Sequence, residues 1–193
     1  MDAFAEAATR RLGLSFSEHK AVLEQCHARL LPAIIAVGQR LMRSIQGGGK
    51  IMLCGNGGSA ADAQHIAAEL IGRFKKERRA FAALALTTDS SILTCIGNDY
   101  SFEDIFARQV AGMARAGDVL VAISTSGNSP NVLKAAGEAR RAGCATVALG
   151  GRGGGKLAPL CDHSIVVPSD ETPRIQEMHI MIGHMLCDLL EDC

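Results

Sequence analysis

The feature that most constrains the fold is a buried strand that leads through a serine-rich loop directly into a helix. Residues 119–123 form an apolar run typical of a strand buried on both faces. Residues 131–141 have the pattern of a helix, which Ser129 can cap and Pro130 can begin. The loop between them carries four hydroxyl groups, on Ser124, Thr125, Ser126 and Ser129. An ordinary Ser/Gly-rich turn is the simpler interpretation, but hydroxyls at a helix N-terminus favour a phosphate site without a fixed positive charge.

The same alternation of strand and helix continues along the chain. Strands are expected at residues 50–54, 81–87, 119–123, 145–149 and 163–167. Helices are expected at residues 17–46, with a possible kink at Pro32, and at 59–73, 90–96, 102–115, 131–141 and 172–191. The pattern predicts an α/β fold in which helices cover both faces of a parallel sheet, a flavodoxin-like three-layer sandwich. We expect an N-terminal helical segment, residues 1–49, that packs on the domain and on the oligomer, and one structural unit over residues 50–193.

Composition excludes several classes of partner. The chain has 193 residues, and its 20 basic and 20 acidic side chains cancel, so neither nucleic acid nor a charged membrane surface is an expected partner. Its apolar segments look too short to span a bilayer and no signal peptide is evident, so we expect a cytoplasmic protein.

The seven cysteines lack CxxC spacing and are expected to be reduced. Four of them lie in or beside apolar runs, as small core residues do: Cys54, Cys95, Cys144 and Cys187.

Two further glycine-rich loops follow predicted strands. Residues 55–60 fit the pattern G-x-G-x-x-A of dinucleotide-binding folds, but this fingerprint alone is weak. The acidic residue expected about 20 positions later would fall near residues 78–80, none of which is acidic, and Asp89 comes late. Residues 150–156 fit most of a Walker pattern. Leu157 replaces the hydroxyl residue that binds Mg²⁺, and Pro159 follows, so this loop is interpreted as a flexible connection.

Two predicted helices carry candidate metal ligands. His65 and Glu69 are four residues apart and therefore share one helix face, a spacing that suits zinc or an acid/base pair. A solvated His–Glu contact is the alternative, and the position behind a glycine loop, at the carboxyl edge of the sheet, favours a site. The last helix is apolar on nearly every side but contains His179 and His184, either of which could instead be a satisfied core histidine.

Together these motifs resemble the phosphoheptose isomerases, which are sugar-isomerase (SIS) domain proteins. The resemblance covers nearly the whole chain as a single SIS domain. It rests on the glycine loop from Asn56, on His65 with Glu69, on Asn98-Asp99, on the serine loop, and on Arg174-Ile175-Gln176-Glu177 with His184. The family converts sedoheptulose 7-phosphate to D-glycero-D-manno-heptose 7-phosphate, for nucleotide-activated heptose of lipopolysaccharide or capsule. Its members are homotetramers, and many bind zinc.

The resemblance also implies residue roles. One Zn²⁺ per subunit would be bound by His65, Glu69, Gln176 and His184, with Glu69 and His184 as the catalytic proton-transfer pair. The sugar phosphate would contact Asn56, Gly57, Gly58, Ser59, Glu69, Asn98, Asp99, Ser124, Thr125, Ser126, Ser129 and Gln176. Some members have an acidic residue directly before the arginine of the last motif, where this chain has Pro173. A role for that acid in opening the sugar ring is therefore not transferred.

The chemistry suits these residue types. Moving a carbonyl from C2 to C1 takes a proton from C1, passes through an enediolate and returns a proton at C2, which a carboxylate and a histidine can perform. A related SIS-fold tetramer that binds the replication initiator protein shares the serine loop and the Arg-Ile-Gln-Glu motif, and we expect it to lack His184. A sugar-phosphate-sensing regulator would add a DNA-binding domain, for which the segment before Lys50 offers only one long helix.

The spacing of two ligands on the last helix predicts a shared site. Gln176 and His184 are eight residues apart, which separates their Cα atoms by roughly 12 Å along a straight helix. Zinc ligand atoms lie about 2.0–2.2 Å from the ion. One of the two residues is therefore expected to come from a neighbouring chain, and isolated monomers are expected to be inactive.

Overall fold

A parallel sheet of five strands forms the centre of the computed structural model, which describes residues 2–193. Its order is β2-β1-β3-β4-β5, the flavodoxin-like arrangement, so the fold class predicted from the alternation is confirmed. Leu53 lies beside Val121, and Val121 lies beside Val147 in the parallel register. The strands are β1 (Ile51–Gly55), β2 (Ala83–Ala85), β3 (Val119–Ser124), β4 (Ala145–Gly150) and β5 (His163–Val166).

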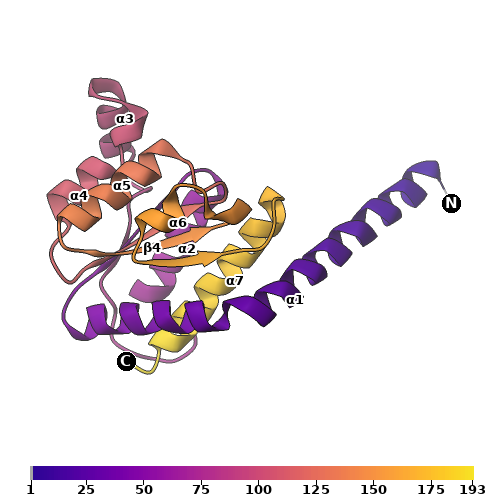
Figure 1. Ribbon diagram of the computed structural model, residues 1–193, viewed down its shortest axis with the longest axis horizontal. Helices are drawn as coiled ribbons and strands as arrows, with labels where there is room; N and C mark the ends of the chain where they lie inside the picture. The colour runs from indigo at the N-terminus through magenta and orange to yellow at the C-terminus, as the bar shows by residue number, and fades with distance from the viewer. Residues whose placement is uncertain (1) are drawn as a thin grey trace.

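Helices cover both faces of this sheet (Figure 1). They are α1 (Ala3–Gln46), α2 (Gly58–Ile71), α3 (Ser90–Asp99), α4 (Ala107–Met113), α5 (Pro130–Arg141), α6 (Leu157–Leu160) and α7 (Thr172–Leu190). Two short 3₁₀ turns, η1 (Phe102–Asp104) and η2 (Arg152–Gly154), complete the connections.

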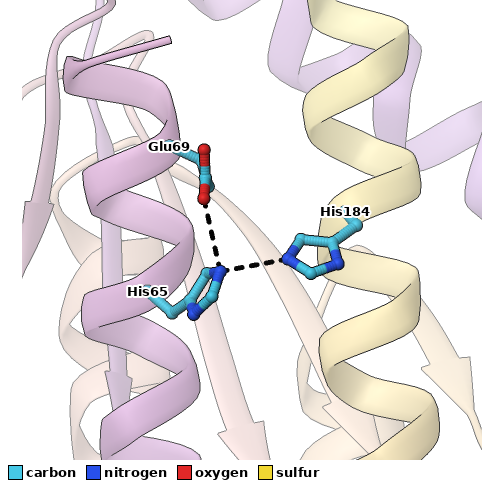
Figure 2. A group of neighbouring side chains, drawn as sticks. All are labelled: His65, Glu69 and His184. Atoms are coloured by element: carbon cyan, nitrogen blue, oxygen red, sulfur yellow. Dashed lines mark hydrogen bonds and ion pairs between the residues drawn. The ribbon is translucent and has the colours of Figure 1, made fainter. Parts of the chain in front are cut away.

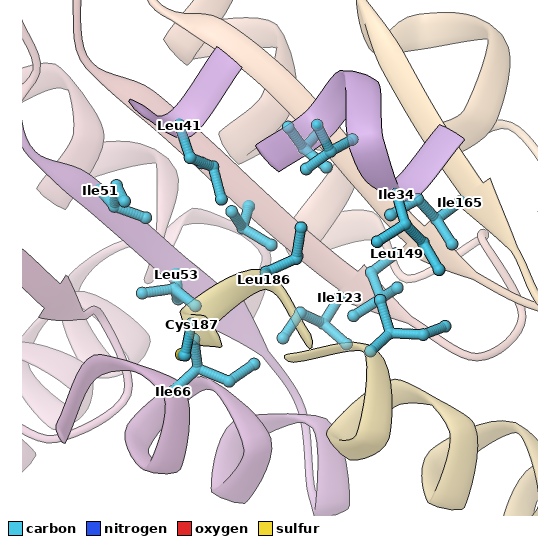
Figure 3. Packing of buried hydrophobic residues seen from close by; sticks show 14 of the residues in the cluster. Ile34, Leu41, Ile51, Leu53, Ile66, Ile123, Leu149, Ile165, Leu186 and Cys187 are labelled. Carbon is cyan, nitrogen blue, oxygen red and sulfur yellow. The ribbon is translucent and has the colours of Figure 1, made fainter. Parts of the chain in front are cut away.

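The core consists of one apolar layer on each face of the sheet. Side chains alternate along a strand, so Leu53 faces the layer formed with α1, α2 and α7, while Met52 faces α4 and α5. Figure 3 shows the first layer, where Ile34 of α1 lies beside Leu149 and Ile165 of the sheet. The second half of α1 is thus part of the core.

The first half of α1 projects from the domain as an arm (Figure 1). The helix begins at Ala3, well before the predicted residue 17, because the side chain of Asp2 caps it by accepting a hydrogen bond from the backbone N–H of Phe4. Pro32 lies inside the helix, whose course bends in Figure 1, in line with the expected kink. By length and composition alone α1 could span a membrane, contrary to the sequence estimate. A core helix of a soluble domain passes the same test, and the second half of α1 packs as one.

Several predicted boundaries change where side chains or single hydrogen bonds interrupt regular structure. The predicted strand at 81–87 shortens to β2, because the backbone N–H of Phe81 bonds to the carbonyl of Leu70 rather than to a strand. The predicted helix at 102–115 divides into η1 and α4, and Ile105 and Phe106 between them are buried in the core. Cys95 is exposed, against the expectation of a core position, whereas the other three cysteines assigned to the core are buried. All seven cysteines are free, as expected.

Candidate active site

Three side chains predicted as metal ligands converge between α2 and α7 (Figure 2). The Nε2 atom of His65 lies 3.3 Å from Oε1 of Glu69 and 3.0 Å from Nε2 of His184. One ligand atom from each residue lies within 4.8 Å of the others. Two atoms bound to a tetrahedral zinc at about 2.0–2.1 Å are separated by roughly 3.3 Å. The spacing of the triad therefore fits such an ion.

The helices place the triad by close packing. Gly183 lies against Ile66, so α2 and α7 approach each other closely where His65 and His184 face one another. The ring of Phe74, just after α2, stacks on His184 with ring centroids 5.3 Å apart. Sequence reasoning did not identify Phe74, because nothing in its local pattern distinguishes it from an ordinary loop aromatic. The triad remains accessible, since 47% of the His65 side chain and 27% of the Glu69 side chain are exposed.

The Arg174–Glu177 motif anchors the start of α7 to α1. Arg174 donates hydrogen bonds to the carbonyl oxygen and hydroxyl of Ser15 and to Oε1 of Glu177, at 2.5, 2.7 and 2.6 Å. His19 bonds to the other carboxylate oxygen of Glu177 at 2.7 Å. Two members of the family motif therefore position the helix that carries His184.

Gln176 occupies a different place from the triad. A Cβ atom added to Gly58 would collide with the Gln176 side chain, so this amide packs directly on the glycine loop at the start of α2. His65 is seven residues further along α2, roughly 10 Å along the helix axis. Glu69 and His184 converge within one chain, whereas Gln176 lies beside the loop.

Hydroxyl groups of the serine loop form hydrogen bonds within the loop and its strand rather than capping α5. Ser129 occupies the cap position and Pro130 begins the helix as predicted, but Ser129 makes no capping bond with its side chain. Its hydroxyl instead lies 3.0 Å from that of buried Ser124. The Ser126 hydroxyl accepts a bond from the backbone N–H of Asn128. The Ser129 hydroxyl therefore does not occupy the N-terminus of α5, where the backbone N–H groups of Val132 and Leu133 bond to the Ser129 carbonyl oxygen.

An amide pair joins the first glycine loop to the serine loop. Asn56 and Asn131 donate to each other's carbonyl oxygens at 2.9 and 2.8 Å. The Asn56 side chain is thereby occupied, so contact with substrate would come from the backbone of its loop. Asn131 was not among the predicted residues, since an asparagine in the first turn of a helix has many ordinary roles.

The third glycine loop supports the serine loop rather than forming a flexible connection. A Cβ atom at Gly127 would collide with the carbonyl oxygen of Gly154. The backbone N–H of Leu157 bonds to the carbonyl of Gly127 at 2.9 Å, and that of Lys156 bonds to Oδ1 of Asn128 at 3.1 Å. These contacts hold the backbone of the serine loop, the candidate phosphate site, in one conformation.

Asn98 and Asp99 lie apart from the other predicted residues. Both are exposed at the end of α3, which projects from the body in Figure 1, and the Asn98 amide bonds to the Asp99 carboxylate at 2.8 Å. Among residues 2–193, the single chain brings neither side chain into hydrogen-bonding contact with the triad or the serine loop.

His179 is the core histidine of α7. It is fully buried, and one ring nitrogen lies 3.1 Å from the carbonyl oxygen of Gly150. Burial lowers the pKa of His179 to about 4, so the ring is neutral near pH 7. Of the two histidines on this helix, His184 alone belongs to the triad.

Comparisons with known proteins agree with this arrangement. The SIS domain family profile matches residues 16–151. A phosphoheptose isomerase of Nitratiruptor sp. is 58% identical over 175 residues, covering 91% of this chain and 94% of that protein. Phosphoheptose isomerase 1 of Campylobacter jejuni is 54% identical over 177 residues, covering 92% and 95%. The solved phosphoheptose isomerase of Neisseria gonorrhoeae superposes with a TM-score of 0.92 at 43% identity, covering 96% of this chain and 100% of that one.

Sequence identity exceeds one half over about nine-tenths of the chain, and a solved phosphoheptose isomerase superposes on 96% of it. The chain belongs to the SIS-domain phosphoheptose isomerases and is a sugar-phosphate aldose–ketose isomerase.

Proposed function

We propose that this chain converts sedoheptulose 7-phosphate to D-glycero-D-manno-heptose 7-phosphate with Glu69 and His184 as its proton-transfer pair. The observation that carries the proposal is the convergence of these two side chains with His65 in one accessible cluster. The product would enter heptose synthesis for lipopolysaccharide or capsule in the cytoplasm.

The two groups divide the proton transfers. Glu69 is suited to take the proton from C1 and to return it at C2, since a carboxylate held against its substrate is an effective base and its protonated form can donate. His184 can then give and take protons at the two substrate oxygens, because imidazole changes charge near neutral pH. Stacking on Phe74 holds the His184 ring in one orientation, and the contact with His65 limits where Glu69 can point.

Zinc is the proposed cofactor, one ion per subunit, because two imidazole nitrogens and a carboxylate oxygen are a donor set that zinc prefers. When bound, it would supply positive charge that stabilises the negatively charged oxygen of the enediolate. His65 would act only as a ligand. A metal-bound Glu69 would be a weaker base than a free one, so Glu69 would either leave the ion during turnover or act while the metal plays a structural part.

A homotetramer is the proposed assembly, with active sites at subunit interfaces. The arm of α1 exposes Phe4, Leu12, Leu14 and Phe16, which a neighbouring copy would cover. Gln176 lies near the glycine loop rather than in the triad of its own chain, so we propose that it binds the metal of a neighbouring subunit. Asn98 and Asp99 would likewise reach substrate in an adjacent subunit.

Replacing a metal ligand should release zinc without disturbing the fold. In His65→Asn, zinc affinity should fall by more than the roughly 10–100-fold typical of losing a ligand's supporting partner. Metal content after dialysis and chelator competition measure this, and zinc should raise the melting temperature of the wild type but not that of His65→Asn. The matched variant His163→Asn, at the start of β5 and remote from the triad, should keep wild-type affinity. Equal zinc affinity in all three proteins would exclude the triad as the metal site.

Removing two hydroxyls of the serine loop should weaken substrate binding. A hydrogen bond to a charged group contributes about 1.5–3 kcal/mol, so the double variant Ser126→Ala, Ser129→Ala should raise KM by roughly 100-fold or more. Steady-state kinetics compare it with Ser164→Ala, an exposed hydroxyl on β5. An unchanged KM in the double variant would place the phosphate elsewhere, with Lys156 the next candidate.

A further inference from the structure

A second candidate binding site, a cavity, lies at the edge of the sheet opposite to the glycine and serine loops. It has a volume of about 630 Å³ and lies beside the amino ends of β1, β2 and β3. The last turns of α1 contribute Arg40 and Arg43, and the loop before β3 contributes Arg115. Lys50 and Asp118 also line it.

The one acidic group in this cavity is already fully used. Asp118 forms an ion pair with Lys50, with 2.5 Å between Nζ and Oδ2. Its carboxylate also accepts hydrogen bonds from the backbone N–H groups of Lys50 and Arg115, at 2.9 and 2.8 Å. These bonds hold the pKa of Asp118 below its usual range, so it stays ionised and neutralises Lys50. The remaining charge of the cavity is that of its three arginines.

No carboxylate in residues 2–193 pairs with Arg40, Arg43 or Arg115, and none of their side chains donates a hydrogen bond within that range. Other arginines of the chain do make such contacts, as Arg141 does with Glu138 and Arg174 with Glu177. Arg43 and Arg115 are exposed and Arg40 is half-buried. Each guanidinium carries five N–H donors in a planar fork that fits a phosphate.

We propose that this cavity binds a phosphate-bearing small molecule with two or more negative charges, independently of the substrate site. Guanidinium groups from two separate segments reach the same hollow, and they bring about three uncompensated positive charges to it. Leu84 and Met113 give the cavity an apolar wall beside these charges, which suits an organic group attached to the phosphate. Lys50 and Asp118 directly precede β1 and β3, so a bound anion stabilises the amino ends of the two strands whose carboxyl ends lead into the glycine and serine loops.

Calorimetry with inorganic pyrophosphate tests the proposal. The substrate loop is first disabled in every protein by Ser126→Ala and Ser129→Ala, so that only the second cavity competes for the probe. Arg40→Gln, Arg43→Gln and Arg115→Gln are then introduced together. Pyrophosphate affinity should fall by at least about tenfold, and the dependence on salt should weaken because exposed charges are screened.

A charge-matched control separates a built site from general attraction. Arg29→Gln, Arg140→Gln and Arg141→Gln remove three exposed positive charges outside the cavity and should leave the affinity unchanged. Without the serine substitutions, both triple variants should keep wild-type isomerase activity. Arg115→Gln alone, in a surface loop, should weaken binding as well and covers the case in which the triple variant does not fold.

A titration with adenosine diphosphate at the same concentration distinguishes an organic phosphate from an inorganic one as the ligand of the cavity. Tighter binding than pyrophosphate would assign the apolar wall to an organic group, and equal binding would indicate an inorganic polyphosphate. Either result supports the anion site. Absence of pyrophosphate binding at millimolar concentration, or an equal loss in the two triple variants, would overturn it.

Discussion

Replacing Glu69 by glutamine should abolish turnover while leaving the fold and phosphate binding in place. The amide keeps the size of the side chain but cannot accept a proton, and losing a positioned base typically costs 10²–10⁴-fold in rate. His184→Gln should have an effect of the same order. Turnover of the aldose–ketose reaction measures both, and circular dichroism with thermal unfolding confirms the folded state.

Glu77→Gln is the matched control for Glu69→Gln, because Glu77 is an exposed carboxylate shortly after α2. It should retain wild-type kinetics. Wild-type activity in Glu69→Gln or in His184→Gln would remove that residue from the mechanism.

Substituting Gly127 by alanine should destabilise the domain and disable phosphate binding together. Gly127 has φ = +64°, a conformation that side-chain-bearing residues rarely adopt, and a Cβ atom would collide with the backbone of Gly154. Backbone strain and overpacking each cost about 1–3 kcal/mol. We therefore expect a loss of roughly 2–6 kcal/mol in the free energy of unfolding, measured by urea denaturation, and a raised KM.

Gly137→Ala, ten residues further along the chain, should have the opposite effect on the free energy of unfolding. Gly137 lies inside α5, and nothing lies within 4 Å of an added Cβ atom. Alanine there should stabilise the protein by roughly 0.5–1 kcal/mol, because glycine loses more conformational freedom in a helix. Equal stability of the two variants would show that the contact between the serine loop and the third glycine loop does not hold in solution.

The architecture was predictable because its signals are local. Apolar runs separated by helical periodicity fix five parallel strands, and the sheet order then follows from the flavodoxin-like pattern. The boundaries that failed depend on single contacts, such as the Asp2 cap that starts α1 and the Phe81–Leu70 hydrogen bond that shortens β2.

The candidate site was predictable only in part. His65 and Glu69 can be recognised from their four-residue spacing on one helix. His184 lies 119 residues beyond His65, and only the fold or a family resemblance shows that it belongs to the same site. Phe74 and Asn131 act through tertiary contacts, namely a ring stack and a paired amide, which no local pattern reports. The hydroxyl of Ser129 bonds to Ser124 instead of capping α5, because the loop folds back on its own strand.

Incubation of the purified, zinc-loaded protein with sedoheptulose 7-phosphate tests the central claim most directly. We expect formation of an aldose heptose 7-phosphate. Chromatography detects this product, and proton exchange at C1 in deuterated water reports the first proton transfer. The Glu69→Gln protein should form none at the same concentration. Absence of both aldose and exchange with the wild type, or aldose formation at the wild-type rate by Glu69→Gln, would contradict the account.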